Sequence, residues 1–167
     1  MNKFDNSKTK QFIKSLSSLC SLEADDNDLV IRSKFNFSYF DPSQQAGQDF
    51  NDWSPQQQCC LLNRLKEYTT KPLEYWRNER VGKGGLKMLA NYGAFPAKSS
   101  FTHPKHVPHQ AEWARFRLGS KLRLIGFTVP AELHRIPHNK LNELFDKNTF
   151  YVVFLDREHR FYIKEDD

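Results

Sequence analysis

The stretch EWARFRLGSKLRLIGF, residues 112–127, combines the alternation of a β-hairpin with an unusual number of positive charges. If residues 119–121 form a three-residue loop, Arg117 pairs with Arg123 across the hairpin. A two-residue loop would instead pair Arg117 with Leu122 and mix apolar and charged side chains on both faces. In the first register, one face of the hairpin carries the apolar residues Ala114, Phe116, Leu118, Leu122 and Leu124. The opposite face carries Arg115, Arg117 and Arg123.

Composition places the chain among globular proteins with an anionic partner. Its 167 residues, 38% of them hydrophobic and 14 of them Phe, are enough for one domain with a core. The net charge is only +5, but residues 98–140 hold eight Lys or Arg against two Glu. This local excess favours a nucleic acid over a membrane as the partner.

Cysteine usage and hydropathy predict a cytoplasmic protein without a membrane segment. Cys59 and Cys60 are adjacent in a helical pattern and Cys20 is remote, which is typical of reduced thiols rather than a disulfide framework. No apolar run approaches the roughly 20 residues that span a bilayer. The first ten residues lack the apolar region of a signal peptide.

Periodicity predicts two helices and two further strands. Residues 7–21 and 54–70 have helical spacing, and the second helix begins with Ser54 as N-cap, Pro55 and Gln57. Alternation in residues 29–40 predicts a strand that ends at Asp41. A final strand, Thr149–Leu155, is apolar on both faces and is expected inside the sheet.

The remaining segments are less regular. Residues 73–80 are expected to form a second helical piece, and residues 86–93 a short helix or a loop. Residues 95–110 predict a long ordered loop, and residues 130–147 a loop with a short helix near its end. The element order predicts an α+β fold, with residues 1–28 as a helical extension and residues 29–167 as a single domain.

The arginine face is the first candidate site. Arginine offers a planar fork of donors that binds phosphate bidentately, and three arginines on one face repel each other unless an anion balances them. The alternative is a solvated strand face balanced by Glu112, Glu158 or the acidic tail, residues 165–167. Because the charges line up on one face, phosphate binding is the favoured interpretation.

The segment DREHRFY, residues 156–162, is the second candidate. His159 can exchange protons near neutral pH, and Tyr162 can stack on a base or donate a proton. The alternative is a surface turn in which the aromatic side chains only pack.

Other motifs are weaker. His103, His106 and His109 have H-x2-H-x2-H spacing, but prolines interrupt the segment and no Cys or carboxylate completes a zinc site, so no metal is expected. VGKGGLK, residues 81–87, does not have the spacing of a phosphate-binding loop. Cys59 and Cys60 are interpreted as packing residues rather than nucleophiles.

The order of helix 54–70, hairpin 112–129 and a final strand followed by His159 and Tyr162 resembles the RelE/YoeB-like toxins of bacterial toxin–antitoxin systems. KLRLIGFTV, residues 121–129, is similar to the family's strand that carries a basic side chain to RNA, and TFYVVFLDREHRFY, residues 149–162, to its final strand. The resemblance implies a RelE-like fold: a twisted antiparallel sheet with helices packed on one face, here with an N-terminal extension. It also implies an mRNA interferase that acts on the ribosome and is neutralised by a cognate antitoxin protein.

The resemblance also implies roles for individual residues. A 2′-hydroxyl attacks the adjacent phosphate without a metal or cofactor, helped by an acid or base and by cations. The expected catalytic residues are His159, Tyr162, Arg117 and Arg123, with Glu112 or Glu158 as an alternative base. The expected RNA-binding residues are Arg115, Lys121, Arg157, Arg160, His106 and His109.

Two other functions remain open from the sequence. The same basic sheet would serve a nucleic-acid- or ribosome-binding module that does not cut RNA. The N-terminal helix and the acidic segment after it, residues 22–29, would serve a partner-binding protein of a stress or phage-defence system.

Overall fold

The computed structural model describes residues 7–16, 22, 24, 26–119 and 121–163 of the chain. Contacts divide the chain into two units, residues 1–31 and residues 32–167. The first unit contains the helix α1 (Ser7–Leu16) and a single 3-10 turn, η1 (Leu29–Ile31). The residues 17–21 expected at the end of the first helix lie outside the described residues, as do Ser120 of the hairpin loop and the acidic tail.

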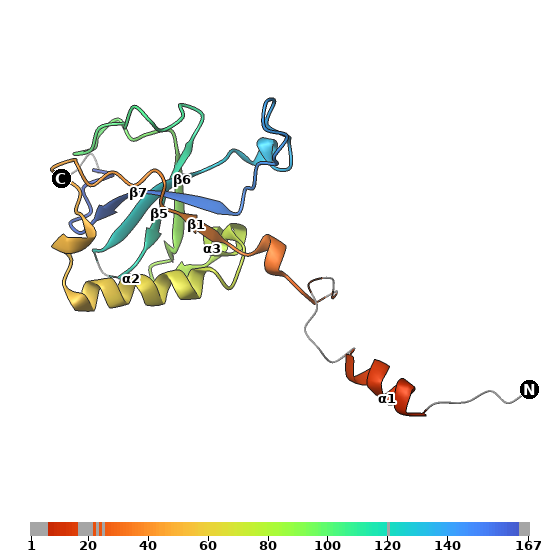
Figure 1. Ribbon diagram of the computed structural model, residues 1–167. Helices are drawn as coiled ribbons and strands as arrows, with labels where there is room; N and C mark the ends of the chain where they lie inside the picture. Colours follow the sequence, from red (N-terminus) through yellow and green to blue (C-terminus); the bar gives the residue numbers. More distant parts are fainter. Residues whose placement is uncertain (1–6, 17–21, 23, 25, 120, 164–167) are drawn as a thin grey trace, which may run out of the picture. The chain divides into compact units, whose positions relative to one another are not determined.

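The second unit has an α+β fold built on a five-stranded mixed sheet (Figure 1). In the order β1-β7-β6-β5-β4, its strands are β1 (Lys34–Asn36), β7 (Thr149–Asp156), β6 (Arg123–Thr128), β5 (Glu112–Arg117) and β4 (Leu89–Gly93). Its helices are α2 (Pro55–Tyr68) and α3 (Leu73–Asn78), with 3-10 turns η2 (Phe50–Asp52) and η3 (Ala131–Leu133). A separate two-stranded sheet consists of β2 (Arg80–Val81) and β3 (Leu86–Lys87).

The expectation of an antiparallel sheet is wrong at one edge. β1 pairs with β7 in parallel, with Phe35 opposite Phe150, whereas the other neighbours in this sheet are antiparallel. The strand is also shorter than the expected 29–40, because residues 29–31 form a 3-10 turn in the first unit.

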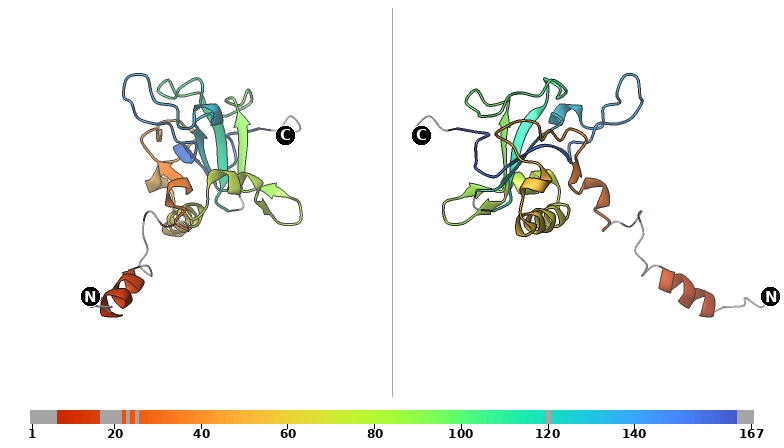
Figure 2. Two further views of the ribbon diagram at one scale, coloured as in Figure 1. Left: turned by 90° about the vertical axis from the view of Figure 1, so that its right-hand side faces the viewer. Right: turned by 60° about the vertical axis from the view of Figure 1, so that its left-hand side comes forward.

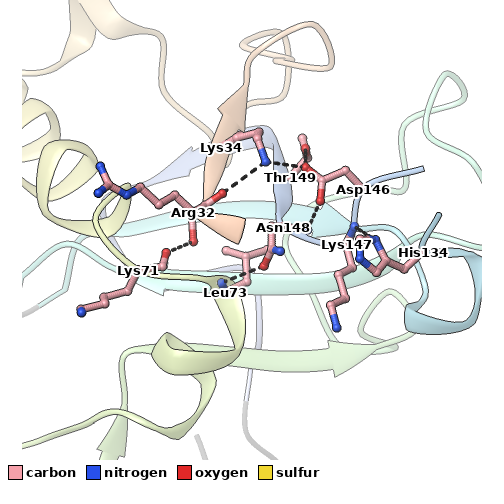
Figure 3. Close-up of polar contacts among 10 residues, drawn as sticks. Arg32, Lys34, Lys71, Leu73, His134, Asp146, Lys147, Asn148 and Thr149 are labelled. Atoms are coloured by element: carbon pink, nitrogen blue, oxygen red, sulfur yellow. Dashed lines mark hydrogen bonds and ion pairs between the residues drawn. The ribbon is translucent and has the colours of Figure 1, made fainter. Parts of the chain in front are cut away.

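Polar side chains fix this parallel edge (Figure 3). Lys34 Nζ forms an ion pair with Asp146 Oδ2 at 2.7 Å. Asn148, which is buried, accepts a hydrogen bond from the backbone N–H of Leu73 at 3.3 Å. The same corner therefore joins β1, the start of β7 and the start of α3.

The helix α2 begins as the sequence predicts. Ser54 Oγ accepts from the backbone N–H of Gln57 at 3.3 Å, and Gln57 Oε1 accepts from the N–H of Ser54 at 2.9 Å. This capping box satisfies two of the N–H groups that a helix start leaves unpaired. The helical prediction for residues 73–80 is confirmed by α3.

Both faces of the sheet are covered. On one face α2 and α3 pack Leu61, Tyr68 and Trp76 against strand residues such as Phe116 and Leu124. On the other face the loop of residues 94–111 contributes an aromatic cluster with Phe101 and Val107, against Trp113, Ile125 and Phe154. The strand β7 lies inside the sheet with its side chains buried on both faces, as expected.

Two segments differ from the sequence expectation. Residues 86–93 form β3 and β4 rather than a short helix or a loop, because β4 finds its hydrogen bonds on the distant β5. In residues 130–147 the short helical turn, η3, lies near the start rather than near the end, and Pro137 and Leu144 form a bridge instead.

Candidate functional site

The hairpin of β5 and β6 has the register that its loop length predicts. Arg117 pairs with Arg123, and the N–H of Leu118 donates to the carbonyl of Leu122 at 3.0 Å. Because side chains alternate along each strand, Arg115, Arg117 and Arg123 share the face opposite α2. We call these three side chains the arginine cluster.

The helix α2 holds the end of β5 that carries the cluster. The buried Tyr68 hydroxyl donates to the carbonyl of Arg117, and Cys60 Sγ donates to the carbonyl of Leu118 at 3.3 Å. Burial raises the pKa of Tyr68 to about 12, so the hydroxyl remains a donor at neutral pH. Cys60 therefore has a structural role, consistent with its interpretation as a packing residue.

Arg123 is buried although it carries a charge. Its side chain is 4% exposed, and its Nη1 donates to the carbonyls of Leu122 at 2.8 Å and Gly119 at 3.2 Å. Burial, together with the positive charges of Arg115 and Arg117, lowers the pKa of Arg123 to about 10. At pH 7 the guanidinium is still protonated, so the cluster retains its third positive charge.

Buried nitrogens of Arg115 and Arg123 lack a hydrogen-bond partner among the described residues. They are Nη1 of Arg115 and Nε of Arg123. A buried donor without an acceptor costs about 1–3 kcal/mol, and more when it is charged.

Asp156 is a carboxylate beside the cluster, and backbone N–H groups already occupy it. Asp156 stands opposite Arg123 in the sheet and is 1% exposed. Its Oδ1 accepts from the N–H groups of Glu158 at 3.2 Å and Arg160 at 3.0 Å, and its Oδ2 from that of Phe161 at 2.9 Å. No ion pair joins Asp156 to Arg115 or Arg123 in the described part of the chain.

His159 lies in the turn that Asp156 organises. Its backbone has a φ of 64°, a conformation that non-glycine residues rarely adopt. Burial and the positive charges of Arg123 and Arg115 lower the pKa of His159 below the ordinary 6.5. At pH 7 the ring is therefore neutral, the form that accepts a proton.

Tyr92 joins the site, and the sequence did not indicate it. The register of β4 shifts between Asn91 and Gly93, and within this bulge the Tyr92 hydroxyl accepts from Arg115 Nε at 3.0 Å. Its ring stacks on that of Tyr162 with centroids 5.1 Å apart and planes at 9°. Tyr162 is 43% exposed, so the pair presents an aromatic surface beside the cluster. The sequence around Tyr92 gives only a weak indication of this role, because the residue precedes a glycine in a segment without clear alternation of apolar and polar residues.

The histidines of the long loop lie at the other end of the sheet. His106 stacks on Tyr39, which contacts Phe127, and His109 stacks on His103. Phe127 is four residues from Arg123 along β6, about 13 Å at the usual rise of a strand. The structure therefore does not bring His106 or His109 to the arginine cluster.

The remaining predicted RNA-binding residues are dispersed. Lys121 is exposed in the loop between β5 and β6, next to the cluster. Arg157 Nη1 donates to the carbonyl of Asp52 at 3.2 Å, and Arg160 forms an ion pair with Glu158. These two arginines are engaged outside the cluster.

The alternative bases are placed less favourably than His159. Glu112 lies at the far end of β5, opposite Thr128, and accepts from Asn91 Nδ2 at 3.2 Å. Since even-numbered residues of β5 face α2, its side chain is on the other face from the arginines. Glu158 is exposed and paired with Arg160.

Searches for metal sites, membrane segments and known relatives give negative results. Within the described ranges, no three His, Cys, Asp or Glu side chains are grouped so that they could hold a metal ion. None of the helices in those ranges has the length and apolar composition to cross a bilayer. No family model, curated protein or solved structure matches the chain.

Proposed function

We propose that the protein binds RNA at the arginine cluster and cleaves it without a metal ion. The observation that carries the proposal is a row of guanidinium groups on one face of the sheet, beside a carboxylate, Asp156, that the backbone already occupies. A phosphodiester would bring negative charge to this row, and arginine binds it bidentately. The resemblance of residues 121–129 and 149–162 to RelE/YoeB-like toxins favours RNA over other phosphate compounds.

The proposed reaction uses the groups around the cluster. The 2′-oxygen bonds to the adjacent phosphorus and the bond to the 5′-oxygen breaks, which yields a 2′,3′-cyclic phosphate and a 5′-hydroxyl. Neutral His159 takes the proton of the 2′-hydroxyl, and Tyr162 gives a proton to the leaving oxygen. Arg117 and Arg123 stabilise the negative charge that the phosphorane-like state adds.

This activity would make the protein a cytoplasmic toxin of a toxin–antitoxin or related defence system. Cleavage of mRNA on the ribosome would inhibit translation. A cognate antitoxin would neutralise the toxin by covering the basic face, since an acidic surface complements the cluster.

Induced expression tests the proposal directly. Wild-type protein should arrest growth and produce mRNA fragments with cyclic phosphate ends, whereas His159→Ala and Arg117→Ala should not. Loss of an acid–base group should lower the cleavage rate by about 10²–10⁴-fold. Lys66→Ala, on the exposed side of α2, removes one positive charge elsewhere and should remain toxic.

Circular dichroism of each variant separates loss of activity from loss of the fold. If wild-type expression is harmless, or if folded His159→Ala protein still cleaves RNA, the proposed reaction is wrong.

One observation favours a second candidate, a nucleic-acid-binding module that does not cut. The exposed Tyr162 stacks on the partly buried Tyr92, and an accessible aromatic ring beside positive charge is the usual arrangement for holding single-stranded bases. In that case the purified protein would bind ribosomes or RNA and leave the RNA intact over hours.

A further inference from the structure

The glycine-rich segment VGKGGLK, residues 81–87, has a defined structure that the proposed reaction does not use. It forms the tip and part of the strands of the β2–β3 hairpin, with φ of 68° at Gly82 and 65° at Gly85. Figure 2 shows this hairpin projecting from the body of the second unit in both views. Every residue from Arg80 to Lys87 is exposed. The segment is therefore an arm in solvent rather than a phosphate-binding loop.

The hairpin has one basic and one apolar face. Arg80 stands opposite Lys87, and Val81 opposite Leu86. Like charges directly opposite each other destabilise a strand pair. Arg80 Nη1 donates to the carbonyl of Gly85 at 3.2 Å, which holds the guanidinium over the hairpin. An anion held between the two side chains would relieve this repulsion.

The hairpin leads directly into the arginine cluster. The N–H of Arg117 donates to the carbonyl of Met88 at 3.0 Å, and Met88 follows Lys87 in the chain. The tip residue Lys83 lies in the turn of residues 82–85 between β2 and β3. The hairpin is therefore continuous with β4, the strand that pairs with the cluster-bearing β5.

Few carboxylates lie near the hairpin in the sequence. Residues 80–111 contain five Lys or Arg and no Asp or Glu. Glu79 immediately precedes the hairpin, next to Arg80. Lys83 and Lys87 are both exposed.

We infer that the β2–β3 hairpin is a second contact for the phosphate backbone of the RNA held by the arginine cluster. The inference rests on the proposed function. It assigns to Arg80, Lys83 and Lys87 a role in affinity and orientation, outside the bond that breaks. A single RNA strand that runs from the arginine cluster along the hairpin would place its phosphates against positive charge at both.

The salt dependence of binding tests the inference. The probe is a 2′-O-methyl oligouridine of about 20 nucleotides, long enough for a non-specific single-strand site. It lacks the attacking hydroxyl and cannot be cleaved by the proposed route. The double variant Lys83→Ala/Lys87→Ala should bind more weakly, and the slope of log K against log salt should fall by about 1.4, since each phosphate contact contributes about 0.7 on single strands.

A matched control removes the same charge elsewhere. Lys66→Ala/Lys140→Ala alters two exposed lysines, one on α2 and one in the loop after β6, and should keep the wild-type slope. Equal slopes for the hairpin variant and the wild type overturn this inference but leave the cluster proposal standing. If the wild type does not bind the probe, the proposed function itself fails.

Discussion

At the scale of single residues, Arg115 and Arg123 of the arginine cluster have different hydrogen-bond partners. Arg123 is buried and bonded to loop carbonyls, whereas Arg115 bonds the Tyr92 hydroxyl and leaves a buried nitrogen without a partner among the described residues. Arg123 therefore holds the carbonyls of the β5–β6 loop, whereas Arg115 ties β5 to β4 through Tyr92. The charge of both acts on His159, because each lowers its pKa.

The first prediction concerns the pH at which the His159 imidazole takes up a proton. Its imidazole should titrate below pH 6.5, so the neutral base form is lost only as the pH falls through that lowered value. Arg115→Gln removes a nearby positive charge and should move the midpoint upward. Nuclear magnetic resonance of the imidazole protons measures both midpoints. An unchanged midpoint in the variant would mean that Arg115 and His159 do not interact.

Sequence reasoning succeeded for residues whose neighbours are local. Alternation and loop length predicted the pairing of Arg117 with Arg123, because both strands lie within one hairpin. It could not place His106 or Tyr92, because their positions depend on Tyr39 and on a bulge in β4. Long-range packing, rather than local pattern, decides which side chains join the cluster.

Helices and strands were likewise predictable where local sequence decides them, and not where a distant partner does. The capping box of α2 lies within four residues and was predictable. The parallel pairing of β1 joins residues 34–36 to residues 149–151, and no local pattern indicates such a partner. The strand β4 also has only five residues and a register shift, which weakens its period-two signal.

The contact between β6 and β7 tolerates no side chain at Gly126. A Cβ there would overlap the carbonyl oxygen of Tyr151 and lie 2.6 Å from Cε1 of the buried Phe150 ring. Gly126→Ala should lower the free energy of unfolding by about 3 kcal/mol, since backbone and a packed ring must move. Urea denaturation followed by circular dichroism measures the change.

Gly84→Ala is the matched control. A Cβ at Gly84 meets no atom within 4 Å, so its effect should stay within about 0.5 kcal/mol. Similar losses in both variants would show that crowding at Gly126 is not the cause.

At the scale of the whole molecule, the chain divides at residue 31. Both hydrophobic clusters, the sheet and the arginine cluster lie within the second unit. The sheet is paired internally, so this unit contains a complete core of its own.

Deletion of residues 1–31 should therefore leave the second unit folded. Its thermal unfolding should remain cooperative, with a midpoint within about 3 °C of that of the full chain, a shift that corresponds to less than about 1 kcal/mol. Differential scanning calorimetry of both proteins makes the comparison. A broad or absent transition in the shortened chain would show that the first unit contributes to the core.

The bulge in β4 has one further consequence. β4 is an edge strand, and an edge strand offers unpaired N–H and C=O groups on which another molecule can build cross-β fibrils. The register shift between Asn91 and Gly93, with a φ of 71° at Gly93, interrupts that template. The irregularity that brings the Tyr92 hydroxyl to Arg115 thus also guards this edge against amyloid-like self-association.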